Sequence, residues 1–262
     1  MSKNQSVIVV TGGASGIGEA TVRRFARQPG CTVVIGDINI ERAEHLAGEL
    51  REAGASVHAC KLDVSSEQAV KTFCRHVLDT YGVPDTLVNS GGLLQNAVHL
   101  FDLDIEEYDR LQNVNVRGTL LISRELARPM CEVGSGSIIN LCSLTSFRPS
   151  AQIGYAVGKA GLHMLTQVMA AQWGPHGVRV NAVAPGYTLT PAMQARIDSG
   201  ERDPKAVVDK SALRRFVDPA EVAETIHFLC SPGASAITGA ILPVDCGWLV
   251  TSAYAAYASQ PG

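Results

Sequence analysis

The strongest constraint on the fold is a regular alternation of short β-branched runs with longer stretches of helical periodicity. Helical segments of roughly 12–25 residues are expected between strands, which is typical of parallel strands covered on both faces. The sequence therefore predicts an α/β protein with a doubly wound, seven-stranded parallel sheet, a single-domain Rossmann fold over 1–262. The strands are expected near 6–10, 32–37, 57–62, 84–89, 137–143, 178–184 and 237–245. The helices are expected near 19–27, 41–53, 65–81, 105–130, 152–173 and 218–230.

A glycine-rich turn follows the first strand-like run. The turn reads Thr-Gly-Gly-Ala-Ser-Gly-Ile-Gly over 11–18 and leads into an amphipathic helix. Glycine lets the backbone approach a pyrophosphate closely, and a helix N-terminus offers free N–H groups and a positive dipole end. Strand, turn and helix are the context that a dinucleotide fingerprint requires, so 11–18 is predicted to hold a dinucleotide.

The second strand ends in an acid, Asp37, about 20 residues after the glycine turn. A carboxylate there can accept hydrogen bonds from the ribose hydroxyls of adenosine, and it would repel a 2′-phosphate. No arginine follows in 38–40. The pattern favours NAD over NADP. The alternative is an acid that only starts the next helix, near Glu41.

Tyr155 and Lys159 lie four residues apart in the stretch expected to be helical over 152–173. On a helix their side chains project from one face, one turn apart. A lysine ammonium at that distance favours phenolate over phenol, which suits the tyrosine to exchange a proton with an alcohol oxygen. A half-buried aromatic beside a solvated charge is the alternative interpretation.

The residues with chemical potential gather at one place in the predicted fold. In a doubly wound sheet, ligands bind outside the carboxyl ends of the strands. The following residues are all expected at such an end: Gly12, Asp37, Asp63, Asn89, Ser143 and Pro185. This convergence is stronger evidence for a site than any single motif.

The segment 187–213 is polar and turn-prone, with Asp-Ser-Gly-Glu-Arg-Asp-Pro at 198–204. A polar insert of this length at the carboxyl end of a strand is predicted to be a mobile lid over the ligand. A plain pair of surface helices is the alternative.

Charge and composition exclude several classes of protein. The formal net charge of −3 gives no reason to expect nucleic acid or an anionic membrane surface as a partner. No apolar run approaches the roughly 20 residues of a membrane span, and no signal-like segment precedes the first strand, so a cytoplasmic protein is expected. The seven cysteines contain no Cys-x-x-Cys pair and the seven histidines no His-Glu-x-x-His motif, so neither a disulfide framework nor a metal site is predicted.

Together these motifs resemble the classical short-chain dehydrogenase/reductase family. The resemblance covers the chain from Val7 to about Trp248. It is carried by Thr-Gly-x-x-x-Gly-x-Gly at 11–18, Asp63, Asn89, Asn115, Ser143, Tyr155 with Lys159, and Pro185-Gly186. It implies an NAD(P)-dependent oxidoreductase acting on CH–OH groups.

The resemblance implies a role for each of four catalytic residues. Tyr155 is the general acid or base on the substrate oxygen, and Lys159 assists it and binds the nicotinamide ribose. Ser143 hydrogen-bonds the same oxygen, where charge develops. Asn115 is expected to hold a water that links Lys159 to solvent.

The resemblance also implies a dinucleotide site. Asp63 should accept from the adenine amino group, Asn89 and Gly91 should line the adenosine side, and Thr188 and Thr190 should contact the nicotinamide end. The full set is Gly12, Ser15, Gly16, Ile17, Gly18, Asp37, Asp63, Val64, Asn89, Gly91, Tyr155, Lys159, Pro185, Gly186, Thr188 and Thr190.

The chain departs from the family pattern at four places. Asn-Ser-Gly-Gly at 89–92 replaces the usual Asn-Asn-Ala-Gly, and Gly158 replaces the serine that usually precedes the catalytic lysine. Cys142 stands where a serine is common, and Cys246 stands where a glycine is usual. None of these departures removes a catalytic group.

The sequence-based hypothesis is an NAD-dependent dehydrogenase of a secondary alcohol, such as a sugar or polyol. This substrate class is suggested by Asp37 and by a tail at 247–257 that resembles those of sugar- and polyol-oxidising members. An NADPH-dependent 3-oxoacyl-acyl carrier protein reductase or general ketone reductase is the first alternative, and a non-catalytic dinucleotide-binding sensor is the second. A small-molecule alcohol or ketone is the expected substrate. The family resemblance also implies a homotetramer that pairs through the helices near 105–130 and 152–173. The apolar, Ala- and Tyr-rich composition of the tail at 248–258 suggests that it crosses to a neighbouring subunit.

Overall fold

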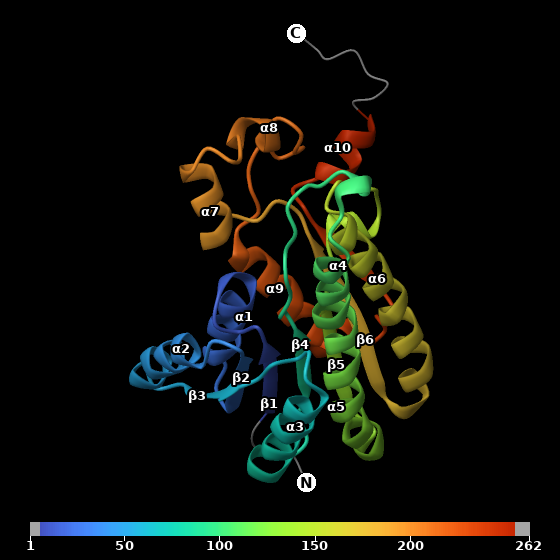
Figure 1. Ribbon diagram of the computed structural model, residues 1–262. Coiled ribbons are helices and arrows are strands. Elements are labelled where there is room, and N and C mark those ends of the chain that lie inside the picture. The colour runs from blue at the N-terminus through green and yellow to red at the C-terminus, as the bar shows by residue number, and fades with distance from the viewer. Residues whose placement is uncertain (1–5, 255–262) are drawn as a thin grey trace.

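The computed structural model describes residues 6–254, and in these residues seven parallel strands form one sheet in the order β3-β2-β1-β4-β5-β6-β7 (Figure 1). This confirms the predicted fold class. The strands are β1 Ser6–Thr11, β2 Cys31–Asp37, β3 Ser56–Lys61, β4 Thr86–Asn89, β5 Gly136–Leu141, β6 Val178–Pro185 and β7 Ile241–Val244. The α-helices are α1 Gly16–Ala26, α2 Ile40–Glu52, α3 Glu67–Tyr81, α4 Ile105–Gln112, α5 Thr119–Val133, α6 Ile153–Trp173, α7 Pro191–Asp198, α8 Pro204–Val208, α9 Pro219–Cys230 and α10 Trp248–Tyr254.

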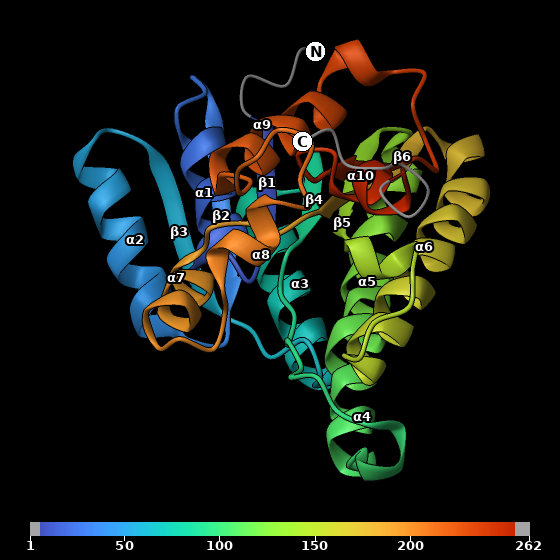
Figure 2. The same ribbon diagram turned by 90° about the horizontal axis from the view of Figure 1, so that it is seen from above.

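Helices cover both faces of the sheet (Figure 2). On one face, α1, α2 and α9 pack against β1 and β2 through fully buried side chains such as Val22 and Ile226. On the other face, α3, α5 and α6 pack against the sheet through Phe73, Leu126 and Met169. Strand residues alternate between these two cores, which explains why the strands are almost continuously apolar.

The strand order reverses between β1 and β4, because β1 pairs with β2 on one side and β4 on the other. The loops that leave these two strands therefore separate and open a crevice at the carboxyl edge of the sheet. Figure 1 shows α7, α8 and α10 above this same edge. The topology thus places the predicted ligand site between the glycine turn, the loop after β4 and the segment 187–213.

Side-chain caps mark the starts of the two helices predicted near 65–81 and 218–230. The Ser66 hydroxyl accepts a hydrogen bond from the Ala69 N–H at 3.2 Å at the start of α3. Asp218 and Glu221 form a reciprocal capping box at the start of α9. In both cases a local side chain satisfies an N–H group that the helix leaves unpaired.

The helix predicted over 105–130 is not uniform. A π-helical turn over Asn113–Gly118 joins α4 to α5. Two tertiary contacts lie at this turn: the Asn115 carboxamide bonds the backbone of Leu93, and Gly118 lies against Val64. Wide turns of this kind occur frequently at functional sites, and sequence periodicity does not reveal them.

Three predicted strands are shorter than expected, and one of them, the fourth, begins at Thr86 instead of residue 84. The fifth strand ends at Leu141, so Ser143 lies two residues beyond it and caps a 3₁₀ turn over Leu144–Ser146. The seventh is limited to Ile241–Val244, because side chains bond the preceding backbone: Asn181 Nδ2 and an Arg179 guanidinium nitrogen both donate to the Ile237 carbonyl.

The segment 187–213 contains two short helices, α7 and α8, separated by a turn. Thr188 forms an isolated parallel bridge with Val217, which ties the two ends of the segment together beside the sheet. An exposed hydrogen bond of 2.8 Å from Arg196 to the Asn96 carboxamide joins α7 to the loop after β4. The segment thus spans the crevice, and its motion as a lid stays a prediction. The predicted tail, 248–258, begins as α10, and 255–258 lie outside the described residues.

Candidate active site

Two adjoining clefts lie at the carboxyl edge of the sheet. The first has a volume of about 240 Å³ and the second about 390 Å³, and they share Ser90, Gly92 and Leu93 as a common wall. The loop after β4 therefore forms the wall between the two clefts.

The clefts divide the predicted residues into two groups. The smaller one, the catalytic cleft, is lined by Ile17, Ser143, Tyr155, Lys159, Pro185, Gly186, Thr188 and Thr190. The larger one, the adenosine-side cleft, is lined by Gly12, Ser15, Asp37, Asp63, Val64 and Gly91. The structure thus brings together most of the predicted residues, which come from six different strand ends.

The glycine turn has the close packing that a dinucleotide cradle requires. Gly12 has φ +63°, and a Cβ placed on it would lie 2.4 Å from the Gly91 Cα. A Cβ on Gly18 would lie 2.0 Å from the Gly12 carbonyl oxygen. Only glycine fits at both positions, and the turn leads directly into the N-terminus of α1, whose Ser15 N-cap makes no side-chain cap. These residues fit the pyrophosphate of a dinucleotide.

Asp37 ends β2 and turns its carboxylate back toward the glycine turn. One carboxylate oxygen accepts a hydrogen bond from the Ala14 N–H at 3.0 Å, and the other accepts from Asn39 N–H at 2.9 Å. The carboxylate is only partly buried, so it remains accessible from the adenosine-side cleft that it lines. Ile38, next in the chain and exposed, also lines this cleft, and it offers no positive charge.

Asp63 and Val64 follow β3 on the far side of the same cleft. One Asp63 oxygen accepts hydrogen bonds from both the N–H and the hydroxyl of Ser65, at 2.9 and 2.6 Å. These bonds fix the carboxylate while leaving its second oxygen without a hydrogen bond from residues 6–254. That oxygen is suited to accept from an amino group.

Tyr155 and Lys159 lie one turn apart on α6, with the lysine Nζ 5.5 Å from the centroid of the phenol ring. Lys159 is only 6% exposed, and its Nζ donates to the Leu141 carbonyl at 2.5 Å. A buried ammonium held by one backbone carbonyl keeps two further N–H donors for other partners.

Ser143 is held next to this pair by the 3₁₀ turn that it caps. Its hydroxyl accepts from the Thr145 N–H at 3.3 Å, and the Ser146 hydroxyl donates to the Lys159 carbonyl at 2.8 Å. This bond ties the 3₁₀ turn to α6. Burial raises the pKa of the neighbouring Cys142 thiol, although the Lys159 charge opposes this, so the thiol remains protonated near neutral pH.

Asn115 lies behind the common wall of the clefts. Its carboxamide accepts from the Leu93 N–H at 2.7 Å and donates to the Leu93 carbonyl at 2.9 Å. A Cβ on Gly92 would lie 3.1 Å from the Asn115 oxygen and 3.9 Å from the Lys159 Nζ. Asn115 and Lys159 thus meet across Gly92, and the water-mediated link between them stays a prediction.

Asn89 requires a correction, because its side chain does not line the adenosine-side cleft. Its amide nitrogen donates to the Ser123 hydroxyl at 2.8 Å and to the Asn140 carboxamide oxygen at 2.9 Å. Asn140 in turn donates to Thr166. This buried polar chain joins β4 and β5 to α5 and α6 beneath the site. Ser90, Gly91 and Gly92 line the cleft instead, since they lie just beyond the strand.

Gln95 was not identified from the sequence, although it bonds the backbone of Tyr155 directly. It is 2% exposed, and its side-chain oxygen accepts from the Tyr155 N–H at 3.2 Å. Its carbonyl accepts from the Gln152 side chain. Because α6 has no cap from its own N-cap side chain, Gln95 supplies a partner from a loop 60 residues away. No local sequence signal indicates such a contact.

Gly158 has a packing explanation. A Cβ there would lie 3.2 Å from the Gln112 side-chain oxygen, and one on Gly154 would lie 3.0 Å from Leu111. The two glycines face α4 one turn apart, and Gln112 donates to the Gly154 carbonyl at 2.7 Å. Close approach of α4 thus accounts for the glycine that precedes Lys159. Cys246 adopts φ +52°, a region that favours the glycine usual there.

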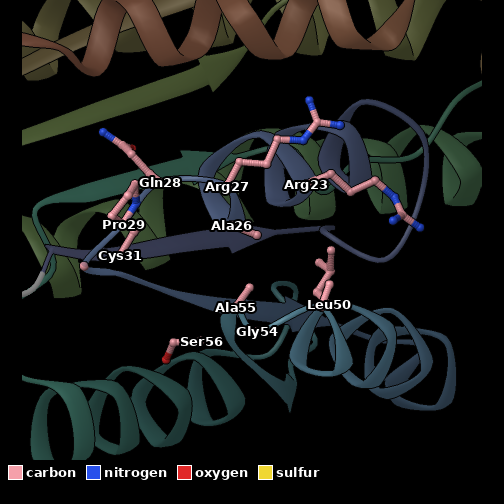
Figure 3. Close-up of a pocket in the computed structure, with 12 residues that line it drawn as sticks. Arg23, Ala26, Arg27, Gln28, Pro29, Cys31, Leu50, Gly54, Ala55 and Ser56 are labelled. Atoms are coloured by element: carbon pink, nitrogen blue, oxygen red, sulfur yellow. The ribbon is translucent and has the colours of Figure 1, made fainter.

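A separate hollow of about 510 Å³ lies at the opposite edge of the sheet (Figure 3). It is formed where α1 and α2 end and β2 and β3 begin, with Arg23, Leu50 and Ala55 among its lining residues. Arg23 is already paired with Glu49 at 2.7 Å. None of the predicted site residues lines this hollow.

Two further observations concern residues 6–254. None of their helices has both the length and the apolar character needed to cross a bilayer. They contain no group of three His, Cys, Asp or Glu side chains placed to hold a metal ion.

Sequence comparison places the chain among oxidoreductases. Residues 12–249 match the family model described as enoyl-(acyl carrier protein) reductase. A cis-4-hydroxycyclohexanecarboxylate dehydrogenase of Sinomonas cyclohexanicum is 38% identical, covering 93% of this chain and 96% of its own. A galactitol 2-dehydrogenase of Rhizobium johnstonii is 36% identical, covering 92% of this chain and 93% of its own. A 3-oxoacyl-(acyl-carrier-protein) reductase of Thermotoga maritima is 34% identical over 93% and 98%.

Solved structures agree with the fold. A Brucella melitensis 16M protein described as ribose-5-phosphate isomerase has a TM-score of 0.92 and 37% identity, covering 99% of this chain and 98% of that one. An NAD⁺-bound xylitol dehydrogenase has a TM-score of 0.86 and 28% identity, covering 94% and 100%. The similarity therefore extends over the whole described chain.

Proposed function

Because the chain belongs to the short-chain dehydrogenase/reductase family, whose members bind a nicotinamide dinucleotide and act on CH–OH groups, we propose that it interconverts a secondary alcohol and a ketone with NAD. The observation that carries this proposal is the position of Ser143, Tyr155 and Lys159 in one cleft that adjoins the glycine-lined cleft. When bound, the dinucleotide accepts or donates the hydride.

The residues of the chain supply proton transfer and orientation. In the oxidation direction, the Tyr155 oxygen takes the proton from the substrate hydroxyl while the Ser143 hydroxyl donates to the same oxygen. The Lys159 ammonium beside the phenol ring stabilises the charge on the tyrosine oxygen. Gln95 fixes the first turn of α6 and so holds Tyr155 in place.

The proposed preference is for NAD. Its support is Asp37, whose carboxylate borders the adenosine-side cleft and would face a 2′-phosphate with a like charge. Ile38 extends this wall without an arginine. Arg110 also lines the cleft, so the balance between the two dinucleotides is a quantity to measure.

The proposed substrate is a hydroxylated small molecule in the sugar and polyol class. The support is the relationship to a galactitol 2-dehydrogenase and the fold shared with a xylitol dehydrogenase. A relative acting on a hydroxycyclohexanecarboxylate adds hydroxy acids to the range. Reduction of a 3-oxoacyl thioester is the second candidate, supported by the Thermotoga maritima relative.

We also propose a homotetramer. The outward faces of α5 and α6 carry exposed apolar side chains, which favours a contact between copies. These side chains are Leu120, Val133, Val157, Met164 and Val168. Light scattering at micromolar concentration tests this, and a monomer would contradict it.

The first experiment compares NAD and NADP binding by calorimetry and then follows a panel of polyols, sugars, hydroxy acids and 3-oxoacyl thioesters at 340 nm. NAD binding with oxidation of an alcohol is the expected result. Preference for NADPH with reduction of the thioester would favour the second candidate. Dinucleotide binding with no turnover of any compound would instead support a sensor.

A further inference from the structure

Unpartnered hydrogen-bond donors gather around the catalytic cleft. Within residues 6–254, six buried side-chain polar atoms lack a hydrogen-bond partner, although one of them, Arg24 Nε, is ion-paired with Glu224 at 2.6 Å. Four of the six belong to segments around this cleft: Gln95 Nε2, Thr145 Oγ1, Arg202 Nε and Trp248 Nε1. Buried polar atoms are nearly always paired, so such a concentration indicates where a ligand supplies acceptors. All four can donate, which points to an oxygen-rich ligand.

Two of these residues belong to a row of stacked side chains. The Arg148 guanidinium carbon lies 4.3 Å from the centroid of the Trp248 ring. The Trp248 and Tyr187 centroids are 5.6 Å apart, and the Arg202 guanidinium carbon lies 5.6 Å from the Tyr187 centroid. Stacking on a ring orients a guanidinium and leaves its N–H edge free to bind a planar anion.

The row lies beside the catalytic cleft, although none of its four side chains lines the cleft itself. Tyr187 lies between two residues that line the cleft, Gly186 and Thr188. Arg148 follows the 3₁₀ turn that Ser143 caps, in the loop before α6. Figure 1 shows α10, which begins at Trp248, beside that loop at the carboxyl edge of the sheet. No residue that lines the adenosine-side cleft is next to a residue of the row in the chain.

Neither arginine of the row is neutralised by the protein. Arg148 and Arg202 take part in none of the ion pairs formed among residues 6–254. Arg215, two residues after the segment 187–213, is instead paired with Glu221 at 2.7 Å. Both arginines of the row are half-buried. A half-buried guanidinium without a carboxylate partner is suited to recognise an anion that enters with the ligand.

We propose that the row of Arg148, Trp248, Tyr187 and Arg202 binds a carboxylate of the substrate, so that the enzyme oxidises hydroxy acids in preference to neutral polyols. This inference rests on the proposed function and narrows its substrate class. The Trp248 Nε1–H, 5% exposed, adds a neutral donor beside the charged ones. The same chemistry could serve a phosphate of the dinucleotide, and the test separates the two sources.

The test compares each hydroxy acid with its own primary amide, which keeps the shape and removes the charge. Suitable pairs are 4-hydroxycyclohexanecarboxylate with its carboxamide, and gluconate with gluconamide. We expect kcat/KM with NAD to favour the acid by roughly 10- to 100-fold, the effect of hydrogen bonds to a charged group. Calorimetric titration of the acid into the enzyme gives a second readout that needs no turnover.

Two variants assign the effect to the row. Arg148→Met and Arg202→Met keep an apolar stem on the ring but remove the charge, and each should lower the acid-to-amide ratio roughly 10-fold while leaving the KM for NAD unchanged. Lys205→Ala is the matched control, because it removes a positive charge from α8 that is 80% exposed. Its acid-to-amide ratio should equal that of the unaltered enzyme.

Several outcomes would overturn the inference. Equal kcat/KM for acid and amide, or an unchanged ratio in both methionine variants, would refute it while the proposed function stands. A raised KM for NAD with an unchanged ratio would assign the arginines to the dinucleotide phosphates. Failure to oxidise any alcohol with either dinucleotide would refute the proposed function, and the calorimetric titration would then test the row by itself. If the enzyme binds the acid and Arg148→Met does not, the row is supported as a carboxylate site. If the enzyme does not bind the acid, the carboxylate site is refuted.

Discussion

The two clefts at the carboxyl edge of the sheet are built by different means. The adenosine-side cleft is shaped largely by backbone, with Gly12 against Gly91 and with Asp37 and Asp63 held by N–H groups. The catalytic cleft is surrounded by side chains from distant segments, and most of the unpartnered buried polar atoms lie around it. A cofactor of constant shape can be recognised by a fixed backbone, whereas a particular substrate must be recognised by side chains on loops.

The largest effect should come from the catalytic cleft. Tyr155→Phe removes the proton-transferring oxygen and keeps the ring, so kcat should fall roughly 100- to 10,000-fold. The dissociation constant for NAD, measured by calorimetry, should stay within a few-fold, because the adenosine-side cleft is untouched. A variant that keeps a tenth of the activity would show that Tyr155 is not the acid or base.

A substitution at Gly12 tests whether the adenosine-side cleft is shaped by its backbone. Gly12→Ala places a Cβ 2.4 Å from the Gly91 Cα at a residue with φ +63°, so NAD binding should be lost and the free energy of unfolding should fall by about 1–3 kcal/mol. Gly48→Ala is the control, since its Cβ meets only the end of Arg51 at 4.0 Å inside α2. Gly48→Ala should bind NAD normally, and its free energy of unfolding should rise by up to about 1 kcal/mol. If the two variants bind NAD equally in calorimetry and are equally stable in thermal unfolding, the adenosine-side cleft does not depend on its glycine backbone.

The dinucleotide preference is tested at Asp37 and Ile38, whose side chains line the adenosine-side cleft. The double change Asp37→Ser with Ile38→Arg removes the repelling charge and adds an attracting one at a side chain that is 65% exposed. The ratio of kcat/KM for NAD to that for NADP should fall roughly 10- to 100-fold, as expected for one or two charge-assisted contacts. Glu41→Gln, at the start of α2, should leave the ratio unchanged. An unchanged ratio in the double variant would favour the alternative that Asp37 only starts the next helix.

The smallest effect concerns the junction between the segment 187–213 and the core. The Arg215 guanidinium and the Asp218 N–H lower the pKa of Glu221 from 4.5 to about 2. A lowered folded-state pKa stabilises the fold above pH 4.5, and this contribution is lost as the pH falls toward 2. Because the pair is exposed, Glu221→Gln should cost less than about 1 kcal/mol at pH 7.

Denaturant unfolding of Glu221→Gln and of the unaltered protein at several pH values measures this. The difference in the free energy of unfolding should narrow below pH 4.5, and kcat should not change. A difference that grows on acidification would contradict the assigned pKa direction.

Local signals account for what could be predicted. The strand–turn–helix at 6–27, the capping box of Asp218 and Glu221, and the end of β2 at Asp37 each depend on residues within a few positions of one another. The strand ends then converge because parallel strands share a carboxyl edge. For this reason most of the predicted site residues line one of the two clefts.

The errors and omissions all involve segments that meet across the fold. Asn89 was expected beside adenosine, but its carboxamide bonds Ser123 and Asn140. Gln95 reaches Tyr155 across 60 residues, and the π-helical turn around Asn115 coincides with its bonds to Leu93. Periodicity carries no information about such pairings.

The sequence by itself determined the family, the order of strands and helices, the glycine turn and the residue types of the catalytic set, because each is encoded in short-range patterns. Only the tertiary structure decided which side chains face the clefts and which are used to hold the sheet together. It also brought Arg148, Tyr187, Arg202 and Trp248 into one row. These residues come from three loops and the start of a helix, and their meeting depends on how those segments pack at the edge of the sheet, which no local propensity specifies.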